Sequence, residues 1–112
     1  MAIVNSLIAS TDTVLLTVPV GKRYAITTIM VCNTWTPNPL DEYDGETNFD
    51  MHLVPDGEPK GNNNMIIRNL ILPAGETFTF DSEKIILDEG DRIILLGESP
   101  TTLSATASYL EV

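Results

Sequence analysis

The segment formed by residues 103–109 alternates between two kinds of side chain without a break. Leu, Ala, Ala and Tyr stand at its odd positions, and Ser and Thr stand at its even positions. A repeat of two residues is typical of a β-strand that buries one face and exposes the other. The same repeat recurs at residues 13–18, 49–54 and 77–80. This periodicity predicts a chain built from strands, because a helix would need apolar residues three and four positions apart.

Other segments are strand-like because they are rich in Ile, Val and Leu, and several of them are apolar on both faces. They comprise residues 3–9, 24–33, 65–72, 85–87 and 92–96. A strand that is apolar on both faces needs a second surface to cover it, either the opposite sheet or a neighbouring subunit. No window has the repeat of a helix, and residues 81–84 allow a single helical turn at most.

Regular turn signals separate these strands. Pro and Gly stand two residues apart at Pro19 and Gly21 and again at Pro73 and Gly75, and both recur in residues 55–61. Proline fixes φ and glycine permits positive φ, so both favour tight reversals. Short strands with turns about every ten residues predict an all-β, antiparallel two-sheet β-sandwich of about eight strands, jelly-roll-like, with residues 1–112 as a single domain. The expected core comprises Val14, Leu16, Ile29, Val31, Phe49, Met51, Leu53, Phe78, Leu95, Leu103 and Tyr109.

The charge balance restricts the partners that the protein can bind. The 112 residues include 16 Asp and Glu against 6 Lys and Arg, a formal net charge of −10. Nucleic-acid backbones and anionic lipid surfaces select basic proteins, so direct binding to nucleic acid or to a membrane is not expected. Solubility alone accounts for such a charge, and so does a partner with a basic surface. No apolar run reaches the roughly 18 residues of a membrane span, and residues 1–9 lack the basic start of a signal peptide, so we expect a protein used without export.

Few residues are suited to catalysis. The single cysteine, Cys32, lies in an apolar run, which predicts a buried, unreactive thiol. The single histidine, His52, shares a strand face with Asp50, and we expect an exposed histidine beside an acid. No motif supplies a serine nucleophile, a phosphate loop or a set of zinc ligands. The sequence therefore predicts a protein that is not an enzyme, with no catalytic, cofactor-binding or metal-binding residues.

Residues 34–47 interrupt the rhythm of strands and turns. This segment contains two prolines, the only tryptophan and four acids. Loops of this length without regular structure are usually functional or flexible, so this loop is the best candidate site. Large aromatic side chains anchor interfaces and acids set charge complementarity, which predicts an interface with another protein. The expected interface residues are Trp35, Leu40, Asp41, Glu42, Tyr43, Asp44 and Glu46.

Other interpretations of this loop remain open. Trp35 can serve as a platform for a sugar ring, or it can fold back over the edge of the sandwich and cap the core. The clustered carboxylates can hold calcium, although their spacing differs from that of an EF-hand loop. If Trp35 anchors a partner, its replacement by alanine is expected to cost on the order of 2 kcal/mol in attachment and to leave the fold intact.

Four short motifs follow one another along the chain. They are Val18-Pro19-Val20-Gly21-Lys22, Val31-Cys32-Asn33, Leu72-Pro73-Ala74-Gly75 and Leu87-x-x-Gly90-Asp91. With these motifs in this order, the chain resembles the small β-sandwich virion proteins of tailed bacteriophages. The resemblance extends over nearly the whole chain.

This resemblance implies a structural protein of the virion, assembled in the cytoplasm of the bacterial host and without catalytic residues. The role that it favours is capsid decoration, by a cement protein that self-associates and docks on the particle. A tail- or fibre-associated component is the alternative role. The implied partners are other copies of the chain, with a trimer among the expected states, and other virion proteins such as the major capsid protein. A free-standing carbohydrate- or calcium-binding β-sandwich module is the competing class of function.

Overall fold

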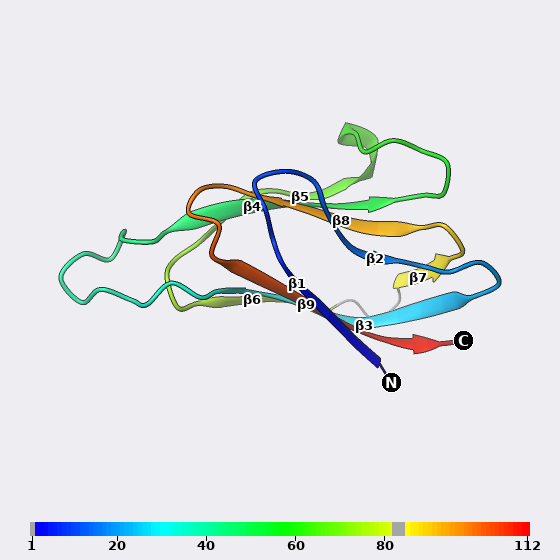
Figure 1. The fold of residues 1–112 in the computed structure, drawn as a ribbon, viewed down its shortest axis with the longest axis horizontal. Coiled ribbons are helices and arrows are strands. Elements are labelled where there is room, and N and C mark those ends of the chain that lie inside the picture. The colour runs from blue at the N-terminus through cyan, green and yellow to red at the C-terminus, as the bar shows by residue number, and fades with distance from the viewer. Residues whose placement is uncertain (1, 82–84) are drawn as a thin grey trace.

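The computed structural model describes residues 2–81 and 85–112, in which two antiparallel sheets pack face to face (Figure 1). The strands are β1 (Ala2–Leu7), β2 (Thr13–Thr17), β3 (Arg23–Asn33), β4 (Thr47–Val54), β5 (Met65–Leu72), β6 (Thr77–Phe80), β7 (Ile85–Asp88), β8 (Arg92–Gly97) and β9 (Leu103–Glu111). One short 3₁₀ turn, η1 (Asn62–Asn64), precedes β5. The described residues contain no α-helix, in agreement with the period of two.

The strand order is that of a jelly roll. Sheet A has the order β1-β9-β3-β6, and sheet B has the order β2-β8-β4-β5. Strand β6 pairs with the second half of β3 and β7 pairs with the first half, so the two form one interrupted edge strand. Counted together, they leave eight strands distributed over two sheets as in a jelly roll. The predicted fold class is confirmed. The sequence allowed a single helical turn at residues 81–84, and residues 82–84 lie outside the described residues.

The inward positions of both sheets form one hydrophobic core. Phe49 of sheet B and Phe78 of sheet A meet between the sheets, with ring centroids 6.0 Å apart. The prediction for Val14 is wrong: it is 48% exposed, whereas Leu15 and Leu16 are both buried. A β-bulge between Val14 and Leu16 shifts the register of β2 against β8 and breaks the alternation on which the prediction relied. The other predicted positions are buried or, at Leu53, Phe78 and Tyr109, half-buried against the core.

The outer faces of the two sheets differ. Residues 55–64, termed the strap, connect β4 to β5 and fold back over the outer face of sheet B (Figure 1). Lys60 of the strap pairs at 2.5 Å with Asp12, which precedes β2, so their ion pair crosses β8. Val54 and Ile94 are buried although they lie outside the central core, as expected for side chains beneath the strap. On the outer face of sheet A, by contrast, Ile3 and Leu7 are 67% and 66% exposed.

Candidate functional site: the finger between β3 and β4

The loop between β3 and β4 extends beyond both sheets along the long axis of the molecule (Figure 1). We term residues 34–46 the finger; Thr47, which the predicted segment included, is the first residue of β4. The molecule measures 51 × 28 × 19 Å, and the finger forms one end of its longest dimension. All residues from 34 to 43 are exposed. Because β3 and β4 belong to different sheets, the base of the finger is fixed to both.

The side chain of Asn33, the last residue of β3, holds the base of the finger. Asn33 is fully buried, and its amide makes four hydrogen bonds. Its Nδ2 donates to the carbonyl oxygens of Gly45 at 2.8 Å and Leu72 at 2.9 Å. Its Oδ1 accepts from the backbone N–H of Trp35 at 3.1 Å and from the hydroxyl of Thr102 at 2.8 Å. One side chain thus joins both ends of the finger to two other segments and uses its full hydrogen-bonding capacity.

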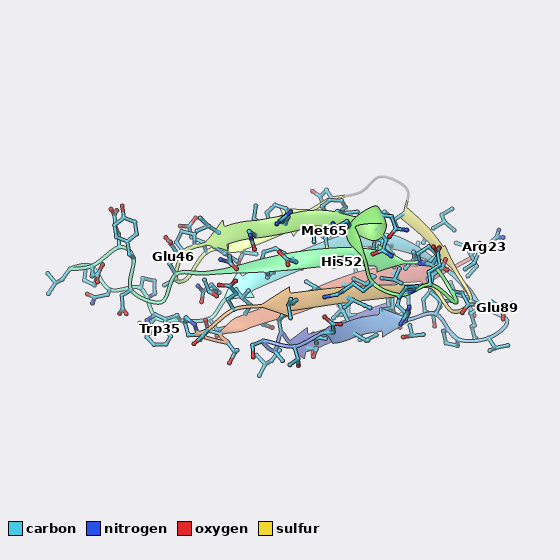
Figure 2. All side chains as sticks on the ribbon, turned by 90° about the horizontal axis from the view of Figure 1, so that it is seen from above. Arg23, Trp35, Glu46, His52, Met65 and Glu89 are labelled. Carbon is cyan, nitrogen blue, oxygen red and sulfur yellow. The ribbon has the colours of Figure 1, made fainter. Side chains whose placement is uncertain are left out.

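Trp35 lies at the base of the finger, near Glu46 (Figure 2). A Cβ atom at Gly45 would lie 2.1 Å from the indole ring, so the ring packs directly on the Gly45 backbone. The φ of Gly45 is 77°, a conformation that favours glycine. The Trp35 Nε1 donates to Asp44 Oδ2 at 3.4 Å, and the residue remains 37% exposed. Trp35 therefore folds back, as one of the alternatives expected, but its ring covers the finger rather than the core.

Short-range hydrogen bonds organise the tip of the finger. Asn38 Oδ1 accepts from the N–H of Leu40 at 2.9 Å, and Asp41 Oδ1 accepts from the N–H of Tyr43 at 3.0 Å. The backbone N–H of Asp41 also donates to the carbonyl of Asn38 at 3.1 Å. Such side-chain turns fix a loop without a sheet or helix beneath it. Leu40 is 94% exposed and Tyr43 is 69% exposed, so the tip presents two large apolar side chains on a shaped backbone.

The finger leans on the turn between β5 and β6. Pro37 packs on Gly75 of this turn, where a Cβ atom would lie 2.5 Å from the proline ring. Beside this contact lies a hollow of about 300 Å³, and Pro37, Pro73, Glu42 and Glu76 are among the residues that line it. The contact braces the finger, so its direction is set by the turn as well as by its own base.

The four acids of the finger do not converge on one point. Asp41 and Glu42 are exposed near the tip, whereas Asp44 and Glu46 are half-buried toward the base. Within residues 2–81 and 85–112, no group of three or more His, Cys, Asp or Glu is placed to hold a metal ion. None of the Lys and Arg residues belongs to the finger, so its negative charge is not neutralised locally. This arrangement suits long-range attraction to a basic surface better than the binding of a cation.

The expectations for His52 and Cys32 are both wrong. His52 is buried, because the strap covers the outward face of β4, which the alternation alone could not reveal. Burial lowers the pKa of His52, and the positive charge of Lys60 lowers it further. Instead of pairing with His52, the Asp50 carboxylate accepts the backbone N–H of Asn69 at 2.7 Å. Cys32 is half-buried on the outer face of sheet A, so the only histidine and the only cysteine lie on opposite sides of the core.

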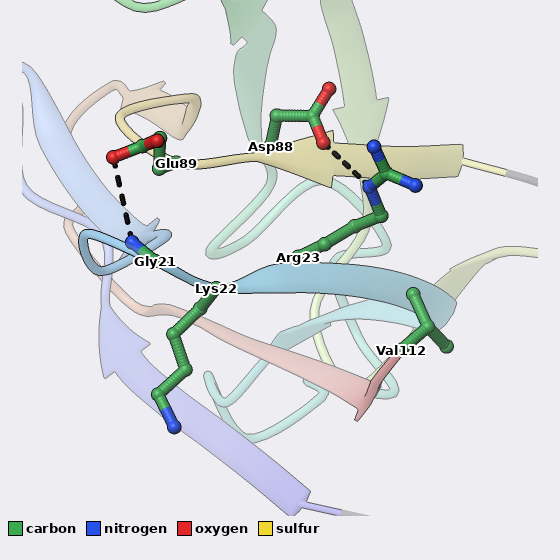
Figure 3. Close-up of a pocket in the computed structure, with 6 residues that line it drawn as sticks. All are labelled: Gly21, Lys22, Arg23, Asp88, Glu89 and Val112. Atoms are coloured by element: carbon green, nitrogen blue, oxygen red, sulfur yellow. Dashed lines mark hydrogen bonds and ion pairs between the residues drawn. The ribbon is translucent and has the colours of Figure 1, made fainter.

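An open hollow of about 500 Å³ at the other end of the molecule has a mainly charged lining (Figure 3). Arg23 Nε donates to Asp88 Oδ1 at 2.7 Å. Lys22 pairs with Glu111 at 2.6 Å, and the hydrogen bond and charge of that carboxylate raise the pKa of Lys22. Each cation is thus matched by a carboxylate of its own, which leaves no convergent set of groups for a ligand.

No protein-family model, curated protein or solved structure matches this chain. The resemblance to virion proteins, which rests on the turn motifs, stays a prediction. Among the described residues, no helix is long and apolar enough to cross a membrane.

Proposed function

We propose that this protein is a non-enzymatic structural component of a tailed-bacteriophage virion, a capsid decoration protein that docks on the particle through the finger. The observation that carries the proposal is the finger itself, which holds Leu40 and Tyr43 in solvent on a hydrogen-bonded backbone. The virion setting comes from the resemblance of the turn motifs. A tail- or fibre-associated position is the alternative within the same function.

The tip has the composition of an interface anchor. A few apolar side chains that become buried supply most of the affinity of a protein interface, and a polar rim surrounds them. The hydrogen bonds of Asn38 and Asp41 hold the tip in shape before docking, which lowers the entropy lost on binding. The exposed acids, Asp41 and Glu42, favour a partner with a basic surface, such as a basic region of the major capsid protein. They disfavour nucleic acid and anionic membranes as direct partners.

The absence of catalysis is part of the proposal. A nucleophile needs a base within hydrogen-bonding reach, and the single histidine is buried beneath the strap while the single cysteine belongs to the other sheet. The acids of the finger lack the fixed, convergent placement that general acid and base groups need. These placements support a binding role.

The first test is to isolate particles from the host and to measure whether the chain co-purifies and in how many copies. Decoration of the capsid predicts a copy number close to that of the major capsid protein. A much lower copy number assigns the chain to the tail or to fibres. Absence of the chain from purified particles refutes the proposal, and binding to a glycan array by a chain that is absent from particles would support the binding-module alternative.

The second test assigns docking to the finger. Leu40→Ser and Tyr43→Ser are each expected to weaken attachment by on the order of 2 kcal/mol, or about 30-fold. Val20→Ser is the matched control, because Val20 is 88% exposed at the opposite end of the sandwich. Attachment should also weaken as salt increases, since salt screens the attraction between acids and a basic surface. Equal losses for the Leu40 and Val20 variants would show that docking does not use the finger.

A further inference from the structure

The outer face of sheet A carries uncharged side chains across β1, β9 and β3, and at its far edge Asp81 accepts from the hydroxyl of Thr28 at 3.5 Å. Strand register places Asn5, Thr106, Met30 and Thr79 in one row across four strands. The rows on either side begin at Leu7 and at Ile3 and continue through Ser, Thr or Cys residues of β9 and β3. Their neighbours along each strand, such as Ala105 and Ala107, point into the core, which confirms that these rows face outward.

Such a face is unusual for this chain. Charged residues make up 20% of the sequence, and the outer face of sheet B carries Asp50 and Arg68. Within the strands, the three rows on sheet A carry none, although Ile3 and Leu7 are about two-thirds exposed and Met30 is 40% exposed. Depletion of charge together with exposed aliphatic side chains is typical of the centre of a protein interface. Thr and Ser keep the face flat enough to pack against another sheet.

We propose that a second copy of this chain covers the outer face of sheet A, with the same face of each copy in contact about a two-fold axis. The distribution of charge on the molecule favours a second copy as the partner of this face. Each copy has a net charge of −10, so two copies repel each other through their acidic surfaces. At the centre of the outer face of sheet A they approach without bringing carboxylates together, because Asp81 lies at its edge, whereas a basic partner is attracted to the finger instead.

The size of the face fits a dimer. The strands of sheet A contain 34 residues, β7 included, and at about 16 Å² for each strand residue they give a face of roughly 550 Å². Two such faces in contact bury roughly 1,100 Å², which is just above the roughly 1,000 Å² that a specific interface needs. The contact closes on itself at two copies, because identical faces pair. We therefore expect a reversible dimer at the weak end of specific interfaces.

This inference rests on the proposed function only for the role of self-association in a particle, and its test needs no particle. Sedimentation equilibrium of the purified chain, from about 1 μM to about 1 mM, should show a monomer–dimer equilibrium. Thr106→Arg and Thr106→Glu place a charge of either sign at the centre of the face, and each should raise the dissociation constant by at least about 10-fold, because the charge is buried without a partner.

Thr17→Arg and Thr17→Glu are the matched controls. Thr17 is an exposed threonine of β2 in the other sheet, and its variants change the net charge by the same amounts. They should leave the dissociation constant within about twofold of the original value. Thermal unfolding of dilute protein checks that all four variants keep the fold.

Two further readouts come from the same samples. Cys32 belongs to the uncharged face, so its alkylation should slow as the protein concentration rises, and Thr106→Arg should abolish this protection. Raising the salt from about 0.05 M to about 0.5 M should tighten the dimer by screening the repulsion between two acidic chains. Docking on a basic surface has the opposite salt dependence, which separates the two contacts.

A dimer that is weakened by both Thr106 variants, with Cys32 protected, supports the inference. A monomer at every concentration overturns it, as does a trimer, since identical paired faces close at two copies. A dimer that tolerates the Thr106 variants, or one that the Thr17 variants weaken equally, overturns it as well. A monomeric chain that still co-purifies with particles would overturn this inference alone and leave the proposed function in place.

Discussion

The finger and the strap flank the same strand, β4, and contain two prolines each, yet they take opposite positions. Both have little regular structure, and the finger contains one glycine where the strap contains two. The finger extends into solvent, and the hydrogen bonds of its tip join residues of the tip itself. The strap folds back onto sheet B and is tied to other elements: Arg92 donates to the carbonyl of Glu58 at 2.6 Å, and Asp91 accepts the N–H of Asp56 at 2.9 Å.

The surface beneath each loop explains this difference. The strap has apolar side chains to cover, because Val54 and Ile94 point outward from sheet B. Burying them stabilises the folded-back position by the hydrophobic effect, at about 25 cal/mol per Å² of apolar area. The finger starts at the end of the sandwich, where no sheet lies beneath it, so its apolar residues at the tip stay exposed. A loop of this kind is thus structural or available for binding according to what it can bury.

The largest effect is expected at the base of the finger. Asn33→Ala removes four hydrogen bonds and leaves the buried carbonyl group of Leu72 and the half-buried one of Gly45 without this partner. We expect the free energy of unfolding to fall by about 3 kcal/mol, measured by urea denaturation, and the finger to become sensitive to proteolysis. Asn62→Ala, which changes an exposed asparagine of the strap, is the control and should change stability by less than about 0.5 kcal/mol. A similar small loss for both variants would show that Asn33 does not hold the finger.

The corresponding asparagine of the strap is expected to matter less. Asn64 is buried, its Nδ2 donates to the Pro59 carbonyl at 3.0 Å, and its Oδ1 accepts the Gly61 N–H at 3.1 Å. Asn64→Ala should lower the free energy of unfolding by about 1.5 kcal/mol, because two hydrogen bonds are lost rather than four. Faster amide exchange in the strap, with exchange in the finger unchanged, should accompany the loss. A loss larger than that of Asn33→Ala would reverse the comparison.

The packing of Trp35 on Gly45 changes the expectation drawn from the sequence. Trp35→Ala removes a ring that is about two-thirds buried within the finger, so it should cost about 1 kcal/mol of stability in addition to any loss of attachment. Thermal unfolding of the isolated chain measures the first term, and binding to particles measures the second. If the stability is unchanged, Trp35 does not stabilise the finger and acts only as an anchor for a partner.

The burial of His52 beneath the strap leads us to expect that stability depends on pH. The pKa of His52 is lowered from 6.5 in the folded chain, mainly by burial, with Lys60 lowering it further and Asp50 and Asp12 opposing the shift. As the pH falls below 6.5, the unfolded chain binds a proton that the folded chain does not, so stability is lost as the solution becomes more acidic. The free energy of unfolding should therefore fall more between about pH 7.5 and about pH 5 in the original chain than in His52→Met. Parallel pH profiles for the two proteins would contradict this assignment.

The periodicity of the sequence predicted the sheets because alternation and turn residues are local properties. Residues 103–109 and the Pro and Gly turns need no knowledge of the rest of the chain to be interpreted. The predicted burial of Val14 was wrong for another local reason. A bulge inserts one residue into β2, and the apolar side chains on both sides of the bulge hide the insertion in the sequence. The predicted exposure of His52 was wrong because alternation distinguishes the two faces of a strand but does not show that another segment covers the outer face.

Part of the geometry of the candidate site could be predicted from the sequence. Loop length and composition selected the finger, and the structure places Leu40, Asp41, Glu42 and Tyr43 in solvent. Asn33 was recognised only as part of a motif, because the partners of its side chain come from both ends of the finger and from two distant segments. The strap resembled an extended turn, since its role depends on Val54 and Ile94 beneath it. One signal for the strap was present elsewhere in the sequence: β8 is apolar on both faces, so a further segment must cover its outer face.

The smallest effect on stability is expected at the tip of the finger, and its smallness is informative. Leu40→Ser and Tyr43→Ser alter side chains that are 94% and 69% exposed, so little buried area is lost on substitution. Each should change the free energy of unfolding by less than about 0.5 kcal/mol, as Val20→Ser should at the other end of the molecule. The backbone bonds that shape the tip come from Asn38 and Asp41, which these variants leave intact. Any loss of attachment then arises at the docking contact itself. A loss of stability above about 1 kcal/mol would mean that the tip is packed like the strap, and the contrast between the two loops would fail.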